Sequence, residues 1–359
     1  MKILFRILVF AFVGLIVFSC NKPAREEERQ NVILFIGDGM GLAQLCTASG
    51  SVADALNIER CSHVGLMKTQ SKDNYITDSA AGATAFSTGH KTKNSYLAVD
   101  STGNPLKTIL EFAEDAGLST GLVVTCAVTH ATPAAFIAHQ TGRENNEAIA
   151  ADIVKTDVDV LIGGGRKYFE TRSDGRNLIT DLTSKGYTVP DSIWQIPSVL
   201  PLKLAWFRAS GHMPGALNGR GEALAESVRL ALNILSRNKK GFFLMVEGSQ
   251  IDWACHSNDS LWLVKEVLDF DKAVGEGLKF AAISKNTTVI VLADHETGGV
   301  SLPAGDLKNH TVSIRFSSHD HTGVMVPVYA SGPGASLFTG IYDNTDVFHK
   351  MMHLLKLEK

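Results

Sequence analysis

Hydrophobic residues gather in short uninterrupted runs, and these runs alternate with segments of helical periodicity. The runs 31–36, 119–125 and 287–293 contain no charged residue and each has an unbroken apolar stretch, which is typical of strands buried on both faces of a parallel sheet. The segments 222–236 and 261–283 repeat their apolar residues at the spacing of amphipathic helices. This alternation predicts an α/β fold, a doubly wound and largely parallel central sheet with helices on both faces.

The same criteria predict the other elements of this pattern. Further strands are expected at 63–70, 158–162, 241–246 and 326–330, and further helices at 42–48, 105–116 and 134–139. Between residues 172 and 221 the periodicity weakens, so we expect an irregular insertion over the sheet there. No low-complexity tract divides residues 31–359, which we expect to form a single domain.

The N-terminal segment has the pattern of an export signal. Two basic residues precede the apolar run 7–18, which is too short to span a bilayer comfortably. The run ends at Ser19-Cys20, which resembles a bacterial lipobox. We therefore predict a lipoprotein signal peptide at 1–19, a lipid anchor on Cys20 and a polar tether at 20–30. The protein is then exported to the periplasm or outer membrane.

Composition narrows the class of protein only slightly. The 359 residues are 45% hydrophobic and 20% charged, as in ordinary globular proteins, and a net charge of −3 gives no basis for nucleic-acid binding. The cysteines after Cys20 show no disulfide framework in their spacing. A Cys46–Cys61 bridge stays open, and we interpret Cys126 and Cys255 as buried thiols.

Acidic and imidazole side chains follow several of the predicted strands. Asp38 comes after the first strand, Glu247 closes a later one, and Asp294 and His295 follow another. Because parallel strands end at the same edge of a sheet, these side chains should meet there. Mixed carboxylate and imidazole ligands favour Zn²⁺ or a similar cation.

Two further features bear on this site. Asp252 and His256 are four residues apart, so a helix would place both on one face. The glycine-rich turn 37–41 could instead be a dinucleotide site, but the third glycine is not at the usual spacing. We favour the interpretation in which the flanking glycines let the backbone approach a metal held by Asp38.

The sequence of residues 75–85 predicts a loop that is followed directly by a helix. The alanine-rich run after Ser79 favours helix, which places this serine in the first turn. Unpaired backbone N–H groups and the positive end of the helix dipole suit an anion at that point. The alternative is a simple helix cap. The metal-ligand residues elsewhere in the chain favour a nucleophilic serine.

These residues and their order resemble the alkaline phosphatase family. The motifs are Gly37-Asp38-Gly39-Met40-Gly41, Thr77-Asp78-Ser79-Ala80-Ala81, Thr132-Pro133 with Arg143 downstream, Val246-Glu247-Gly248 with Asp252 and His256, Ala293-Asp294-His295-Glu296-Thr297-Gly298-Gly299, and His321-Thr322-Gly323. They span the chain from residue 31 to the C-terminus. The resemblance implies a catalytic domain that hydrolyses phosphate monoesters through a covalent phosphoserine at Ser79 and releases inorganic phosphate.

The resemblance also implies two Zn²⁺ and one Mg²⁺. One zinc would be held by Asp252, His256 and His321, and the other by Asp38, Asp294 and His295 with the Ser79 hydroxyl. The third position would use Asp38, Glu247 and Thr132, and Arg143 would bind phosphate. We leave a homodimer open, because the chain lacks large insertions of the family.

Two positions place the chain in one branch of the family. His130 stands where another branch has aspartate, and Trp253 stands where that branch has lysine. An imidazole makes the third site less purely oxygen-lined, so its metal identity is open. Loss of the lysine should weaken the binding of anions.

Other functions remain as alternatives. Sulfatases of the superfamily need a Cys/Ser-x-Pro-x-Arg context, which Ser79-Ala80-Ala81 lacks. Phosphodiesterases of this fold usually carry threonine as nucleophile and lack the third metal set. A surface lipoprotein that only binds phosphate or metal would not need both Ser79 and Arg143.

Overall fold

The computed structural model describes residues 31–357. The predicted signal peptide, lipid anchor and polar tether lie outside these residues. Within the described part, no helix has the length and apolar character needed to cross a membrane.

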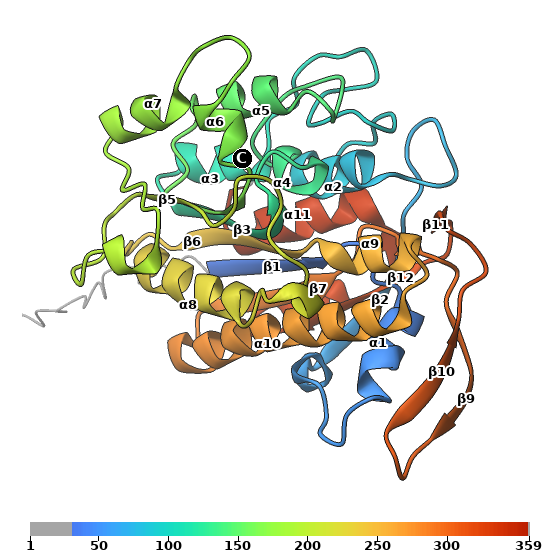
Figure 1. Ribbon diagram of the computed structural model, residues 1–359. Helices are drawn as coiled ribbons and strands as arrows, with labels where there is room; N and C mark the ends of the chain where they lie inside the picture. Colours follow the sequence, from blue (N-terminus) through green and yellow to red (C-terminus); the bar gives the residue numbers. More distant parts are fainter. Residues whose placement is uncertain (1–30, 358–359) are drawn as a thin grey trace, which may run out of the picture.

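One large sheet forms the centre of the molecule (Figure 1). Its nine strands lie in the order β13 (Gly340–Asp343), β2 (His63–Lys68), β12 (Val326–Ser331), β7 (Thr287–Leu292), β1 (Asn31–Gly37), β6 (Phe242–Gly248), β3 (Ser119–Ala127), β4 (Val160–Gly164) and β5 (Leu204–Phe207). Only β12 runs antiparallel to its neighbours in this sheet. The predicted fold class is confirmed.

Helices cover both faces of the sheet. One face carries α1 (Leu42–Ser49), α8 (Ala223–Leu235) and α10 (Ser260–Ser284), and the opposite face carries α2 (Ser79–Thr88), α3 (Ile109–Asp115), α4 (Ala131–Ala134) and α11 (Asn344–Leu354) (Figure 1). Three further helices lie above that second face or beside it: α5 (Asn146–Ile153), α6 (Lys167–Glu170) and α7 (Leu178–Ser184). Every residue of β1 is buried between the two layers, which explains its unbroken apolar run.

The sheet register brings the ends of the central strands together. In β1, Ile36 pairs with Glu247 of β6 on one side and with Leu292 of β7 on the other. Asp38 therefore leaves the sheet beside Glu247 and Asp294. The helix α9 (Gln250–His256) and the small sheet of β8 (Glu296–Thr297) with β11 (His321–Thr322) follow at this edge.

Three predicted segments differ from the structure. The helix expected at 105–116 begins only at Ile109, because Thr108 caps it through the backbone N–H of Glu111. The helix expected at 134–139 ends at Ala134. The expected irregular insertion at 172–221 contains α7 and the edge strand β5, which pairs in parallel with β4.

Other elements were not predicted at all. The hairpin of β9 (Ser301–Asp306) and β10 (Thr311–Arg315) projects beyond the sheet edge (Figure 1). Its residues are mostly exposed, so they carry no core pattern that a sequence could show. Cys46 and Cys61 are free thiols, so the bridge left open between them is absent.

Candidate active site

The first group of site residues follows β1 and β7. Asp38, Asp294 and His295 are fully buried, and a carboxylate or imidazole atom of each lies within 4.8 Å of the others. His295 Nε2 is 3.5 Å from Asp38 Oδ1 and 3.3 Å from Asp294 Oδ2. Gly39 adopts a φ of +69°, and a Cβ there would clash with Thr297 and Asp252, so only glycine fits.

The second group lies on α9 and β11. Asp252 and His256 occupy one face of α9, as their spacing predicts, and His321 meets them from β11. His256 Nε2 and His321 Nε2 face each other at 3.1 Å. The Nδ1 atom of His321 lies 2.9 Å from the carbonyl of Thr77, and that of His256 contacts another backbone carbonyl. With both Nδ1 atoms donating, both Nε2 lone pairs are left for one cation.

Thr297 links the two groups. Its hydroxyl donates to Asp252 Oδ1 and lies 3.2 Å from His295 Nδ1. The threonine therefore fixes the ring of His295 with Nε2 toward Ser79. Sequence reasoning placed Thr297 in a motif but gave it no role, because an ordinary threonine carries no signal of this contact.

Ser79 opens α2 and faces the first group. Asp78 is the N-cap, and its Oδ1 accepts from the backbone N–H of Ala81 at 3.0 Å. The capping role thus falls to Asp78. The Ser79 hydroxyl is left 3.5 Å from Asp38 Oδ1 and 3.4 Å from His295 Nε2.

Arg143 lies beside the same helix start. Its guanidinium donates to Asp78 Oδ2 at 2.9 Å, and that oxygen also accepts from the Ser95 backbone at 2.9 Å. Asp78 thereby orients both the nucleophile candidate and the arginine. A cation fixed next to a helix N-terminus forms a site for an anion.

A third group surrounds Glu247. The ligand-type atoms of Cys126, His130 and Glu247 lie within 4.8 Å of one another. Thr132 and Asp38, the partners expected for Glu247, are also fully buried. Cys126 is the member that sequence reasoning missed, since it was interpreted only as a buried thiol.

His130 and Trp253 lie side by side in the structure. Their rings meet edge to face at 5.7 Å, and His212 packs on both, 4.8 Å from Trp253 and 5.7 Å from His130. His212 Nδ1 accepts from the backbone N–H of Ala127 at 3.1 Å. The segment 172–221 therefore contributes one aromatic ring, that of His212, to this site.

Several buried polar atoms of the site have no hydrogen-bond partner among the described residues. They are Asp38 Oδ2, Asp294 Oδ2, Glu247 Oε1, Thr132 Oγ1 and His130 Nδ1. Each such atom costs roughly 1–3 kcal/mol if nothing pairs with it. Together they provide oxygen and nitrogen donors, which fits divalent cations.

The pKa values show the same crowding of charge. Burial raises the pKa of Glu247 to about 7 and that of Asp294 to about 6, and burial also raises the pKa of Asp38. Burial lowers the pKa of His130 to about 3. The hydrogen bond between His256 and Asp252 raises the pKa of His256 to about 9. Without cations, the chain can keep these groups together only by protonating acids and leaving buried imidazoles neutral.

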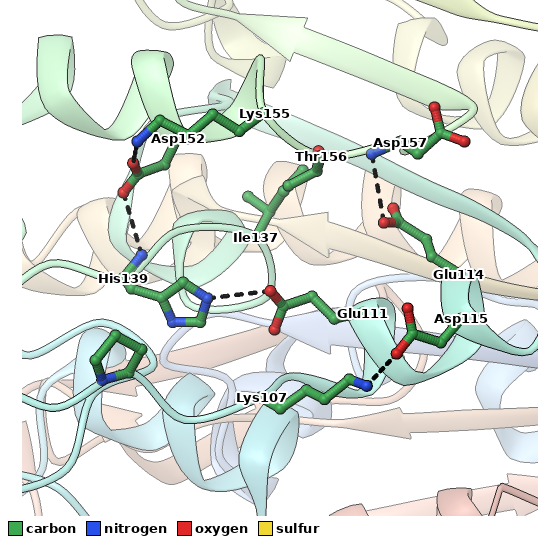
Figure 2. A pocket seen from close by; sticks show the side chains of 11 residues that line it. Lys107, Glu111, Glu114, Asp115, Ile137, His139, Asp152, Lys155, Thr156 and Asp157 are labelled. Atoms are coloured by element: carbon green, nitrogen blue, oxygen red, sulfur yellow. Dashed lines mark hydrogen bonds and ion pairs between the residues drawn. The ribbon is translucent and has the colours of Figure 1, made fainter.

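A separate cavity of about 760 Å³ also contains acids and a histidine (Figure 2). It shares no residue with the three groups. Asp157 at its rim precedes β4, and Glu114 accepts from Thr120 near the start of β3. This part of the cavity therefore lies at the amino ends of these strands, away from the site.

Comparisons with known proteins identify the family of this chain. The model of the family described as alkaline phosphatase matches residues 29–313 and 304–357. Alkaline phosphatase 4 of Bacillus subtilis (strain 168) is 34% identical over 95% of this chain and 92% of its own. The alkaline phosphatase of the Antarctic bacterium TAB5 has a TM-score of 0.87 and 39% identity, covering 92% of this chain and 99% of that one.

A variant of the TAB5 enzyme, with a histidine replaced by aspartate, is described with Mg bound in its M3 site; it is 37% identical to this chain, with a TM-score of 0.87 and the same coverage. This chain belongs to the alkaline phosphatase family. It is a phosphoric monoester hydrolase, which confirms the predicted class of enzyme.

Proposed function

We propose that the protein is an exported, metal-dependent alkaline phosphatase that works through a covalent phosphoserine at Ser79. The observation that carries this proposal is the position of the Ser79 hydroxyl. It lies at the start of α2, within 3.5 Å of both Asp38 and His295, and beside the arginine held by Asp78. A serine used only as a cap would not need these neighbours, because Asp78 already caps the helix.

The residues of the chain divide the reaction between them. Arg143 binds oxygens of the phosphate and turns phosphorus toward Ser79. Oγ of Ser79 loses its proton and forms a bond to phosphorus as the bond from phosphorus to the alcohol oxygen breaks, and the alcohol leaves after taking up a proton from solvent. Water then hydrolyses the phosphoserine, which releases inorganic phosphate and restores the hydroxyl.

The three groups of residues fit the cations that the family resemblance implies. Asp252, His256 and His321 would hold one Zn²⁺, and Asp38, Asp294 and His295 would hold the other. Glu247 and Thr132 would hold the third cation together with Asp38. When bound, the cations supply charge stabilisation for the entering and leaving oxygens.

The remaining assignments rest on the sequence alone. The pattern of residues 1–20 supports export and a lipid anchor on Cys20. The presence of His130 and Trp253 at their two positions supports the His/Trp branch, in which the third site contains an imidazole. We leave a homodimer as one option for the assembly.

Release of phosphate from a chromogenic monoester tests the proposal. We expect exhaustive chelation to abolish activity, and divalent cations, Zn²⁺ with or without Mg²⁺, to restore it. Elemental analysis of each sample gives the metal content. Activity that survives in a sample without detectable metal would contradict the proposal.

A further inference from the structure

Cys126 lies at the third group of the site. It belongs to the last part of β3, and its side chain is fully buried. Its Sγ is 3.3 Å from Glu247 Oε2. Sulfur, the His130 imidazole and the Glu247 carboxylate lie within 4.8 Å of one another, and no assigned role uses the thiol.

Two partners of this thiol point to a missing ligand. Glu247 Oε1 and His130 Nδ1 are buried and have no hydrogen-bond partner among the residues that the structure describes. The other carboxylate oxygen, Oε2, already accepts from Ser249 at 2.7 Å. Oε2 is also the oxygen that faces Cys126 Sγ, so the thiol and the unsatisfied Oε1 meet at the same carboxylate.

The distances suit one cation shared by sulfur, nitrogen and oxygen. With Zn–S near 2.3 Å and Zn–O near 2.1 Å, sulfur and oxygen on a tetrahedral ion lie about 3.6 Å apart. The observed separation of 3.3 Å between Cys126 Sγ and Glu247 Oε2 is close to that value. Thiolate and imidazole favour Zn²⁺ and similar soft or borderline cations, whereas Mg²⁺ requires hard oxygen ligands.

We propose that Cys126 is a ligand of the third metal position and makes it prefer Zn²⁺ over Mg²⁺. This inference rests on the proposed metal-dependent function. On binding, the Sγ–H bond breaks, an Sγ–metal bond forms and the proton passes to solvent, with no change of oxidation state. His130 and Glu247 supply the nitrogen and oxygen of the same donor set.

Cobalt substitution provides the direct test. A thiolate bound to Co²⁺ gives a near-ultraviolet charge-transfer band, which oxygen and nitrogen ligands do not give. We expect the band in the full-length protein loaded with three equivalents of Co²⁺ and its loss in Cys126→Ser. Cys255→Ser is the matched control: Cys255 is equally buried but lies outside all three groups, so this variant should keep the band.

Metal competition gives a second readout. After dialysis with Zn²⁺ against excess Mg²⁺, we expect three zinc ions per wild-type chain, and two zinc ions with one magnesium in Cys126→Ser. The preference of the third site for zinc should fall at least about tenfold. If Cys126→Ser does not fold, the converse variant with Cys20, Cys46, Cys61 and Cys255 all changed to serine should still show the band.

Two outcomes separate this inference from the proposed function. If the wild type is active but shows no charge-transfer band, the inference about Cys126 is contradicted and the proposed function is not. The thiol is then only a hydrogen-bond donor to Glu247 or to the Ala127 carbonyl, 3.1 Å away. A wild type that binds its metals but hydrolyses no monoester contradicts the proposed function itself.

Discussion

The catalytic edge, which is the edge of the sheet that carries the three groups of ligand residues, and the cavity of Figure 2 both contain carboxylates and histidines. The two regions differ in how these side chains are paired. In the cavity, Glu111 accepts from His139 at 3.2 Å, and Asp152 accepts from Gln140 at 2.6 Å. At the catalytic edge, Glu247 Oε1 and Asp38 Oδ2 accept from no described residue. The cavity is complete without a ligand, whereas the catalytic edge is not.

This difference shows which feature identifies a site. The cavity is large, but its charges are paired with neighbouring residues. Burying an unpaired carboxylate is far more costly than burying a paired one, so unpaired carboxylate oxygens persist where a cation or substrate compensates them. The state of the buried polar atoms is therefore a better guide to function here than the size of the hollow.

Removing the nucleophile should give the largest effect. We expect Ser79→Ala to lower monoesterase activity at least about a hundredfold while its metals stay bound, because water replaces the hydroxyl poorly. Initial rates and elemental analysis on the same samples measure both quantities.

Ser260→Ala is the matched control for that variant. Ser260 also follows an aspartate cap, Asp259, at the start of α10, but it contacts none of the three groups of ligand residues in any described hydrogen bond. It should keep wild-type activity. Equal activity in Ser79→Ala and wild type would remove the distinction between the catalytic edge and an ordinary helix start.

Loss of the threonine that links the two histidine groups should have an intermediate effect. Thr297→Val keeps the shape but removes the hydroxyl that contacts Asp252 and His295. Residues that orient metal ligands typically contribute about 10- to 100-fold in metal affinity or activity. We expect a loss in that range, with more Zn²⁺ needed for half-maximal reactivation.

The exposed Thr311 of β10 provides the control for this change. Thr311→Val alters the same chemical group on a strand that carries no site residue. It should reactivate at the wild-type concentration of Zn²⁺. Identical zinc titrations for Thr297→Val and wild type would show that the hydroxyl does not position the ligands.

Most of the fold and the ligand groups could be predicted because their signals are local. The apolar run of β1 and the acid that follows it both lie within eight residues, 31–38. Parallel strands end at one edge, so Asp38, Glu247 and Asp294 could be brought together without coordinates. The helical spacing of Asp252 and His256 predicted their shared face for the same reason.

The remaining features depend on contacts between distant segments. Cys126 can be placed in the site only through its contact with Glu247, which lies 121 residues further along the chain. His212 lies in a segment of weak periodicity, and only tertiary packing brings its ring against Trp253. The hairpin of β9 and β10 is mostly exposed, and in β10 only Val312 and Ile314 alternate with polar residues, which is too short a pattern to predict a strand.

The smallest predicted effect concerns stability and lies in the cavity. Burial raises the pKa of Glu114 to about 7, although the hydrogen bonds from the Asp157 backbone and Thr120 oppose this. The folded state therefore holds this proton more tightly than the unfolded state, whose pKa is about 4.3. The contribution of the protonated Glu114 carboxyl group to the free energy of unfolding is complete below about pH 4 and is lost as the pH rises to about 7.

Glu114→Gln should remove this pH dependence, because the amide stays neutral. After allowance for partial exposure of the carboxylate, we expect the variant to gain about 1 kcal/mol relative to wild type between pH 4.5 and pH 8. Urea unfolding in the presence of chelator gives the free energy of unfolding of both proteins at each pH. The difference between variant and wild type is then compared between the two pH values, so that the contribution of the site carboxylates, which both proteins share, cancels. Asp115→Asn changes an exposed carboxylate of the same cavity and should show no such gain. Monoesterase activity of Glu114→Gln with metals restored should match wild type, and a loss like that of Thr297→Val would mean that cavity and catalytic edge are not independent.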